Sequence, residues 1–303
     1  MIKNHAASIK AKLLKLSKES QGETFNIILS RYVRERFLYR LGNSQYSNKF
    51  VLKGATLFTI WYGEPHRPTK DLDLLGYCLN EIPNIEKIFK EVCRIHYEQD
   101  GVVFCPETVK GIRIKEDQDY EGVRLTIKGR LEKAELAVQV DIGFGDAISP
   151  ELKLVEFPTI LDLASTKLQA YPPETVVAEK FQAMVNLGMA NSRVKDFYDI
   201  WFLTQKFPFQ GSVLRNAMKK TFKRRKTPLP SEEPLALTQE FYENPEKQKQ
   251  WEGFLKKGKL QMECKTLSYT ITNLKQFLLP VCLAALSNTE FDFTWSLDKQ
   301  TWV

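Results

Sequence analysis

The sequence predicts a mixed α/β (α+β) protein, in which a mixed sheet flanked by helices is followed by a helical C-terminal domain. Short apolar runs between residues 49 and 144, bounded by glycine or charged residues, indicate strands. Segments whose apolar residues recur at three- and four-residue steps indicate helices around them. At 303 residues and 43% hydrophobic content, the chain can hold one large domain or two ordinary ones. We expect domains at 1–170 and 171–303.

The first half alternates between the two kinds of segment. Helical spacing from residue 9 to about residue 41, interrupted near Gln21-Gly22, predicts two helices. Two short helices are expected further along, at 55–63 and 84–99. The predicted strands are 49–54, 70–77, 121–130 and 134–144.

The second half is predicted to be helical. Tyr171-Pro172-Pro173 is the expected joint, because proline cannot continue a helix interior but is accepted at a helix start. Helices are predicted at 173–187 and 193–205, and at least two more should end near Ser287. A basic run, "KKTFKRRK", lies between them at 219–226.

Composition narrows the class of protein. A net charge of +7 suits a polyanionic partner without requiring one. Five cysteines without a Cys-x-x-Cys pair indicate neither a disulfide framework nor a zinc site. The N-terminus has lysines among its apolar residues, unlike a signal peptide, and the apolar segment 274–286 is too short to span a bilayer. We therefore expect a soluble cytoplasmic protein with no membrane partner.

Two aspartates stand one residue apart in "GEPHRPTKDLDLLGY", residues 63–77. On a strand, Asp71 and Asp73 face one side while Leu72 and Leu74 face the core. Paired carboxylates repel each other, and a divalent ion such as magnesium, which prefers carboxylate oxygens, would compensate them. The alternative is that both aspartates are solvated on an exposed strand face.

Two further segments could join this pair. In "VLKGATLF" a strand runs into Gly54 and a helix, where backbone N–H groups and the Thr56 hydroxyl could approach a phosphate. In "AVQVDIGFGD", Asp141 faces away from the inward valines, so an adjacent strand would bring it toward the aspartate pair. Three carboxylates on neighbouring strands can hold two metal ions for nucleotidyl transfer. Asp141 could equally cap a strand end before the glycine turn.

Four blocks, in order, resemble the AbiEii/AbiGii toxin family, which are nucleotidyltransferases of type IV toxin–antitoxin systems. They are the Lys-Gly-Ala-Thr block, the Arg-Pro-Thr-Lys-Asp-Leu-Asp block, "TVVAEKFQAMV" and "RVKDFYDIWFL". The resemblance implies a nucleotidyltransferase-like fold, with phosphate-binding and catalytic residues at matching positions. The phosphate-binding positions implied are Lys53, Gly54, Thr56, Arg67, Thr69 and Lys180. The catalytic positions implied are Asp71, Asp73, Lys180 and Asp196. In this hypothesis Asp71 and Asp73 are the metal ligands, and the strand pattern adds Asp141 as a possible third.

The resemblance also implies cofactors and partners. Magnesium or manganese would be the cofactor and a nucleoside triphosphate the nucleotide donor. An RNA, such as the acceptor end of a tRNA, would receive the nucleotide, and a cognate antitoxin would neutralise the toxin. The family name links such toxins to abortive infection. The chain has Ala55 where the family has a second glycine, which affects how closely the backbone can approach the phosphates.

The residues taken singly leave alternatives open. Lys180 could be a surface lysine beside Glu179, and Asp196 and Asp199, three residues apart on a helix, could form surface ion pairs with Arg193 or Lys195. Two basic segments could follow a nucleic-acid backbone or simply be solvated faces. These segments are Arg31, Arg34, Arg36 and Arg40, and the run Lys219–Lys226.

Three hypotheses for function follow. The first is a toxin that adds nucleotides to RNA and blocks translation. The second has the same chemistry with a protein or a small molecule, such as an aminoglycoside, as acceptor. The third is a nucleotide- or RNA-binding protein that has lost turnover, for which Ala55 is the hint.

Overall fold

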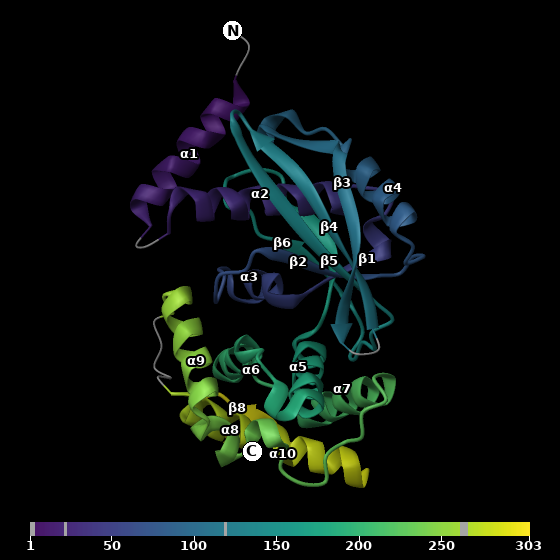
Figure 1. Ribbon diagram of the computed structural model, residues 1–303, viewed down its shortest axis with the longest axis vertical. Coiled ribbons are helices and arrows are strands. Elements are labelled where there is room, and N and C mark those ends of the chain that lie inside the picture. The colour runs from purple at the N-terminus through teal and green to yellow at the C-terminus, as the bar shows by residue number, and fades with distance from the viewer. Residues whose placement is uncertain (1–3, 21–22, 118–119, 261–265) are drawn as a thin grey trace. The chain divides into compact units, whose positions relative to one another are not determined.

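The computed structural model describes residues 4–20, 23–117, 120–260 and 266–303, and these pack as two compact units (Figure 1). The sheet unit comprises Met1–Pro65, Thr69–Gly145 and Lys153–Ala170. The helical unit comprises His66–Pro68, Asp146–Leu152 and Tyr171–Val303. The short segment His66–Pro68 therefore groups with the helices, although it precedes the aspartate strand by only a few residues.

The sheet unit is built on a seven-stranded mixed sheet with the order β3-β4-β5-β2-β1-β7-β6. β2 pairs in parallel with β5, and β1 pairs in parallel with β7, while the other pairs are antiparallel. The strands are β1 (Phe50–Lys53), β2 (Asp71–Gly76), β3 (Val102–Asp117), β4 (Tyr120–Leu131), β5 (Ala134–Phe144), β6 (Lys153–Phe157) and β7 (Thr166–Ala170).

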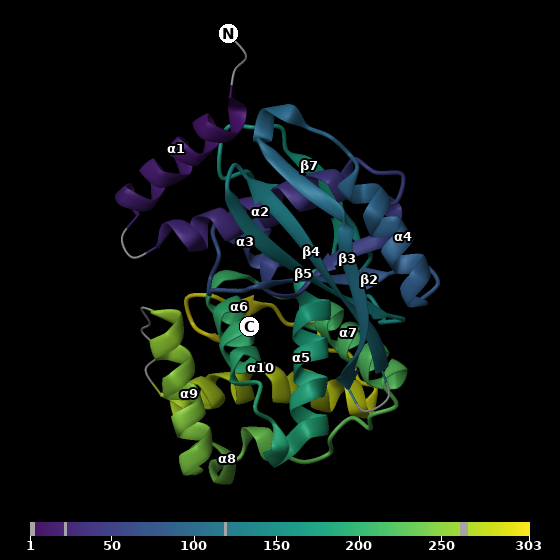
Figure 2. The ribbon, with the colours of Figure 1, turned by 45° about the horizontal axis from the view of Figure 1, so that its top comes forward.

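Helices cover the sheet. α2 packs against β5 and β7, and α4 lies along β3, as Figure 2 shows. α2 is apolar along its core face, and Tyr32, Val33 and Phe37 are fully buried there. The helices of this unit are α1 (His5–Glu19), α2 (Phe25–Gly42), α3 (Leu57–Tyr62) and α4 (Ile82–Cys93).

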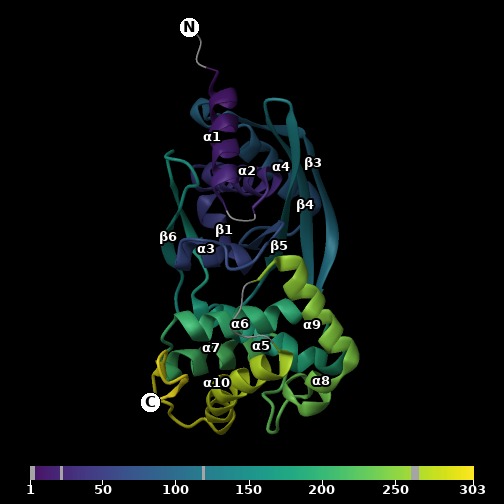
Figure 3. The ribbon, with the colours of Figure 1, turned by 90° about the vertical axis from the view of Figure 1, so that its left-hand side faces the viewer.

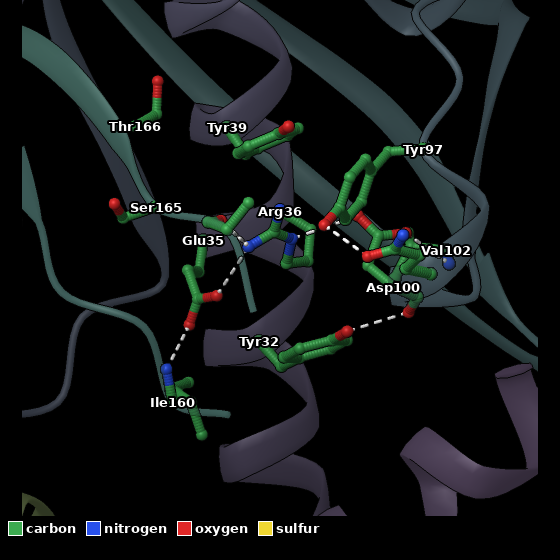
Figure 4. Close-up of polar contacts among 12 residues, drawn as sticks. Tyr32, Glu35, Arg36, Tyr39, Tyr97, Asp100, Val102, Ile160, Ser165 and Thr166 are labelled. Carbon is green, nitrogen blue, oxygen red and sulfur yellow. Dashed lines mark hydrogen bonds and ion pairs between the residues drawn. The ribbon is translucent and has the colours of Figure 1, made fainter. Parts of the chain in front are cut away.

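A buried ionic cluster ties α2 to the start of β3 (Figure 4). The Asp100 carboxylate accepts hydrogen bonds from Arg36 Nε at 3.0 Å, from Arg40 Nη1 at 2.5 Å and from the Val102 backbone N–H at 2.9 Å. Glu35 accepts from Arg36 and from the Ile160 backbone N–H. Arg36 and Arg40 are therefore core residues, and the interpretation that they follow a nucleic-acid backbone is wrong.

The helical unit contains six helices and a small hairpin in its described residues. α5 packs on α7, and α10 packs on α6 and α7 (Figure 3). The elements are α5 (Pro173–Leu187), α6 (Val194–Lys206), α7 (Gly211–Arg224), α8 (Gln239–Glu243), α9 (Pro245–Gly258), α10 (Leu267–Ser287), β8 (Trp295–Ser296) and β9 (Thr301–Trp302).

α10 extends well beyond the apolar segment recognised in the sequence. Its 21 residues make it long and apolar enough, by length and composition, to cross a membrane, and it carries Pro280 inside. Half of its apolar window is buried inside the structure, where Phe277 contacts the rings of Phe209 and Trp295. That burial is typical of a core helix.

The predicted mixed α/β class is confirmed, since a mixed sheet flanked by helices is followed by helices. The four predicted strands and the helices flanking them are present. Strands β3, β6 and β7 were not predicted. Cys78, Cys93, Cys105 and Cys282 are free thiols, and Cys264 lies outside the described residues.

Candidate active site

The glycine turn lies directly against the aspartate strand. β1 ends at Lys53, and a single 3-10 turn, Gly54–Thr56, leads into α3. Gly54 has φ +73°, and a Cβ atom there would lie 2.0 Å from Asp73 Oδ2. Only glycine allows both this left-handed backbone and this close approach. Gly54 and Asp71 are 17 residues apart in the sequence. The Lys-Gly block and the Asp-x-Asp block thus lie in contact in the sheet unit.

A transverse row of four charged residues crosses this part of the sheet. Lys53 is the register partner of Asp73, Asp73 of Asp141, and Asp141 of Arg124. Register partners on adjacent strands project from the same face. The row therefore reads positive, negative, negative, positive across β1, β2, β5 and β4. This confirms that β2 and β5 are neighbours and that Asp141 comes toward the aspartate pair.

The opposite face of these strands forms the core. Leu72 and Leu74 are buried, as are Val138 and Val140, whereas Asp71 and Asp73 are partly exposed. The alternation predicted for both strands is therefore confirmed.

Asp141 is already engaged. Arg124 donates from Nε to Asp141 Oδ1 at 2.8 Å and from Nη2 to Oδ2 at 2.7 Å, a bidentate pair. These hydrogen bonds raise the pKa of Arg124. The pair leaves further lone pairs on the Asp141 oxygens, and a metal ion would have to be bound through these. Its assignment as a ligand stays a prediction.

The carboxylates suit a magnesium ion that keeps most of its other positions for water and phosphate. Asp71 and Asp73 share a face of β2, and one or two carboxylates plus substrate phosphates are the usual protein environment of Mg²⁺. In the ranges that the structure describes, no group of three or more His, Cys, Asp or Glu side chains could hold a metal ion by itself. Asp71 and Asp73 alone would leave most positions of such an ion to water and phosphate.

The helical unit holds a second group of predicted residues. Lys180 on α5 lies between two carboxylates of α6, with Nζ 2.5 Å from Asp196 Oδ1 and 2.8 Å from Asp199 Oδ2. Arg193 Nε lies 2.8 Å from Asp196 Oδ2. Lys180, Asp196 and Asp199 are all buried. The alternatives of a surface lysine and a surface ion-pair set are therefore wrong.

Asp199 is the centre of this group. Arg67 donates to it from Nε at 2.6 Å and from Nη2 at 2.8 Å, and His66 Nε2 lies 2.7 Å from Oδ1. The His66 ring stacks on Tyr198, which lies next to Asp199 in the chain, with the centroids 5.8 Å apart. The Arg-x-Thr-x-Asp block and the Lys-Asp-x-x-Asp block are thus joined through Arg67 and Asp199.

The charges in this group fix its protonation states. Burial alone would raise the pKa of Asp199, but Arg67 and Lys180 hold it well below its usual range. Burial likewise opposes ionisation of Asp196, yet Lys180 and Arg193 lower its pKa. The two aspartates outweigh the effect of burial on Lys180 and raise its pKa. Burial lowers the pKa of His66, so its ring is neutral at pH 7.

These states limit the chemistry that each group can perform. Lys180 remains a fixed cation, and Asp196 and Asp199 remain anions. A carboxylate with a lowered pKa and both oxygens near cations is a poor proton acceptor at neutral pH. The carboxylates of Asp196 and Asp199 are therefore better suited to fixing the positions of Lys180 and Arg67 than to accepting a proton.

The remaining predicted positions are placed as follows. Thr56 is buried in the 3-10 turn, and the Thr69 hydroxyl is 3.5 Å from the Asp71 carbonyl oxygen. Lys195 is exposed on α6. In the basic run, Arg225 donates to Gln182 Oε1 at 3.0 Å and lies 3.6 Å from Asp146, so it belongs to the packing of its unit.

Two residues of these groups were missed in the sequence. His66 had only its place directly before Arg67 as a signal. Arg124 had none, because its pairing with Asp141 depends on the register of β4 and β5.

A mixed sheet whose adjacent strands present carboxylates beside a glycine turn is the arrangement of a nucleotidyltransferase. The chain belongs to the AbiEii nucleotidyl transferase toxin family of type IV toxin–antitoxin systems, whose model matches residues 36–264. Membership implies a nucleoside triphosphate as substrate and an antitoxin as partner.

Two solved structures from Helicobacter pylori are similar to the chain. JHP933 shares 18% sequence identity at a TM-score of 0.49, over 93% of this chain and 96% of that one. A putative nucleotidyltransferase shares 18% identity at a TM-score of 0.49, over 88% of this chain and 98% of that one. Comparison with curated proteins gives no match.

Proposed function

We propose that the protein is a divalent-metal-dependent toxin that transfers a nucleoside monophosphate from a nucleoside triphosphate to an RNA. The observation that carries this proposal is the pair Asp71 and Asp73 on one face of β2, beside a glycine turn and in register with Asp141. In the reaction, the acceptor hydroxyl oxygen attacks the α-phosphorus and the bond to the β-phosphate oxygen breaks. Pyrophosphate leaves, and the hydroxyl proton passes to solvent.

Asp71 and Asp73 are the residues that would hold Mg²⁺ or Mn²⁺, with Asp141 as a candidate third ligand. When bound, the ion supplies positive charge to the phosphate oxygens that gain negative charge in the transition state. Gly54 lets the turn lie directly against the Asp73 carboxylate, and Ala55 adds only one methyl group to this turn. Lys53 and the Thr56 and Thr69 hydroxyls contribute cationic and hydrogen-bonding groups of the same unit.

The helical unit supplies further phosphate-binding residues in this proposal. Lys180 and Arg67 are cations whose positions are fixed by Asp196 and Asp199. We assign Asp196 to positioning Lys180, because its lowered pKa makes proton abstraction unfavourable.

An RNA acceptor is supported by the charge of α7. Lys219, Lys220 and Lys223 border a hollow of about 410 Å³, and among the described residues no carboxylate lies within ion-pair distance of these three lysines. Lysines without a carboxylate partner suit a phosphate backbone. A tRNA as acceptor, a role in abortive infection and a cytoplasmic location belong to the same proposal.

The test is label transfer from each of the four α-labelled triphosphates to total RNA, with magnesium, manganese or chelator. Wild-type protein should label RNA only with a metal present, and Asp71→Ala should abolish labelling. The matched control is Asp292→Ala, which removes an exposed carboxyl of the helical unit. Labelling by Asp71→Ala at the wild-type rate would overturn the metal assignment.

The same assay separates the alternative functions. Label appearing on protein or on an aminoglycoside, and not on RNA, would move the chain to the second hypothesis. Nucleotide binding without transfer to any acceptor would establish a binding protein without turnover.

A further inference from the structure

A small pocket lies inside the sheet unit, directly behind the glycine turn. Its volume is about 70 Å³. One face of α2 forms one wall, the turn and α3 form another, and the end of β6 closes it. The lining includes apolar side chains of Ile27, Leu38, Leu72, Phe157, Pro158 and Ile160. A few polar side chains also line the pocket, among them Arg34 and Thr56.

Arg34 is the important polar group. It is 8% exposed, and among the described residues its Nη1 donates to Ser30 Oγ at 2.8 Å and to the Lys70 carbonyl oxygen at 3.3 Å. No carboxylate lies within ion-pair distance of it in the part of the chain that the structure describes. A buried cation without an anionic partner is unfavourable. Burial and the nearby Arg31 lower the pKa of Arg34 to about 10, because the more distant charge of Asp71, which acts in the opposite direction, offsets them only in part.

The other charged residues on the wall do not compensate Arg34. Arg31 is paired with Glu23, with Nη1 at 2.7 Å from Oε1. Glu35 is directed to Arg36 and to the Ile160 N–H, and burial raises its pKa to about 7. The pocket therefore carries an excess of positive charge.

A second observation points to a ligand. The Thr56 hydroxyl is fully buried and has no hydrogen-bond partner among the described residues, and Thr56 lines this pocket. Buried hydroxyls usually find a partner, because leaving one unsatisfied is costly. Thr59 and Thr69 add two more hydroxyls to the lining.

We propose that this pocket is an anion subsite that receives one phosphoryl group of a nucleoside phosphate, with Arg34 as its charge partner and Thr56 as a hydrogen-bond donor. A water molecule needs about 10 to 15 Å³ by this measure, so the pocket of about 70 Å³ has room for about five to seven water-sized atoms, enough for the heavy atoms of a phosphoryl group. Ala55 and Thr56 also belong to the glycine turn, so the subsite shares this turn with the proposed nucleotide site. Arg34 lies outside residues 36–264, the part matched by the family.

The inference rests on the proposed function, so its test measures binding rather than transfer. Full-length wild-type protein, Arg34→Met and the control Arg130→Met are titrated by calorimetry with inorganic tripolyphosphate, a nucleoside triphosphate and its nucleoside, in chelator. Arg130 is an exposed arginine of the same unit that pairs with Glu135. Arg34→Met should weaken tripolyphosphate and triphosphate binding about 10- to 100-fold, the scale of one charged hydrogen-bonded contact. The control should bind as wild type does.

Ligand-free stability separates this role from a structural one. Because Arg34→Met removes a buried charge that has no ion-pair partner among the described residues and that Asp71 offsets only in part, its melting temperature without ligand should equal or exceed that of wild type. If Arg34→Met fails to fold, Arg34→Gln takes its place, since its amide can still donate to the Lys70 carbonyl. Unchanged affinity for tripolyphosphate in the folded variant would overturn the subsite. So would nucleoside binding as tight as triphosphate binding in the wild type.

The outcomes also keep the two proposals apart. Wild-type transfer together with normal triphosphate binding by the Arg34 variant removes the subsite and leaves the proposed function. Tripolyphosphate binding that depends on Arg34, without transfer to any acceptor, removes the proposed function and leaves the subsite.

Discussion

Replacing Asp196 with asparagine separates the two roles that this residue could have. The change keeps the side-chain size and removes the charge between Lys180 and Arg193. Lys180 then retains only Asp199, at 2.8 Å, and the new amide group faces Arg193 as a second donor. If Asp196 positions Lys180, nucleotide binding and stability should both weaken. If Asp196 instead takes the proton of the acceptor hydroxyl, the rate of nucleotide transfer should fall while binding and stability stay unchanged.

The magnitudes of the two effects differ enough to be resolved. One charged hydrogen bond lost in a buried site is worth about 1.5 to 3 kcal/mol of unfolding free energy. With Lys180 still held by Asp199, we expect the transfer rate at saturating triphosphate to fall by less than about tenfold. Loss of a general base typically costs about 100- to 10,000-fold in rate.

Urea denaturation of the full-length chain, triphosphate titration and label transfer at saturating nucleotide give the three quantities. Asp292→Asn is the control, since it removes an exposed carboxyl of the same unit and should change none of them. A rate loss above about 100-fold, with affinity and unfolding free energy at wild-type values, would refute the positioning role.

Three further predictions concern the rest of the chain. Asp100→Asn leaves two buried arginines without their carboxylate and should lower the unfolding free energy by about 3 to 5 kcal/mol in urea denaturation; a loss below about 1 kcal/mol would contradict the cluster's role. Burial raises the pKa of Glu35 from 4.5 to about 7, so its ionisation destabilises the fold as pH rises through that range. The stability of Glu35→Gln relative to wild type should therefore increase by up to about 3 kcal/mol between pH 5 and pH 8 in the same assay, and a constant difference would argue against it. Replacing both Lys220 and Lys223 with Glu should reduce RNA affinity and its salt dependence, measured by filter binding, without unfolding the protein. Arg225→Glu should instead destabilise the helical unit, because Arg225 contacts Gln182 and Asp146. If the double variant binds RNA as tightly as wild type, the basic run is only a solvated face.

The local sequence pattern predicted the strands that have one apolar face and one polar face. β2 and β5 alternate between buried aliphatic and polar residues, so the facing of Asp71, Asp73 and Asp141 could be read from the sequence. β3 could not, because it contains Pro106 and Gly111 and has a register irregularity between Cys105 and Lys110. β6 is mostly exposed and has no apolar face to detect.

Contacts between residues far apart in the sequence could not be predicted from the local sequence pattern. The sequence identified Lys180, Asp196 and Asp199 through family blocks, yet their alternatives were surface positions. Burial at these sites depends on how α5 and α6 pack, and the role of His66 depends on a contact 133 residues away with Asp199. Arg34 was taken with three other arginines as one basic segment, and the structure divides that segment into core and pocket residues.

The charged row on the sheet is set by a turn far from it. β4 and β5 are joined by Glu132 and Lys133, with Leu131 paired to Ala134 and Glu132 at φ +51°. Counting from this two-residue turn places Arg124 opposite Asp141. One residue added to the turn that shifts the pairing by one position would rotate Asp141 to the opposite face and bring Val140 or Ile142 to the charged one. The hairpin length at this remote tip thus controls which side chains reach the charged row, so an insertion here should preserve the row only if it leaves the pairing of β4 and β5 unchanged, for example by forming a bulge.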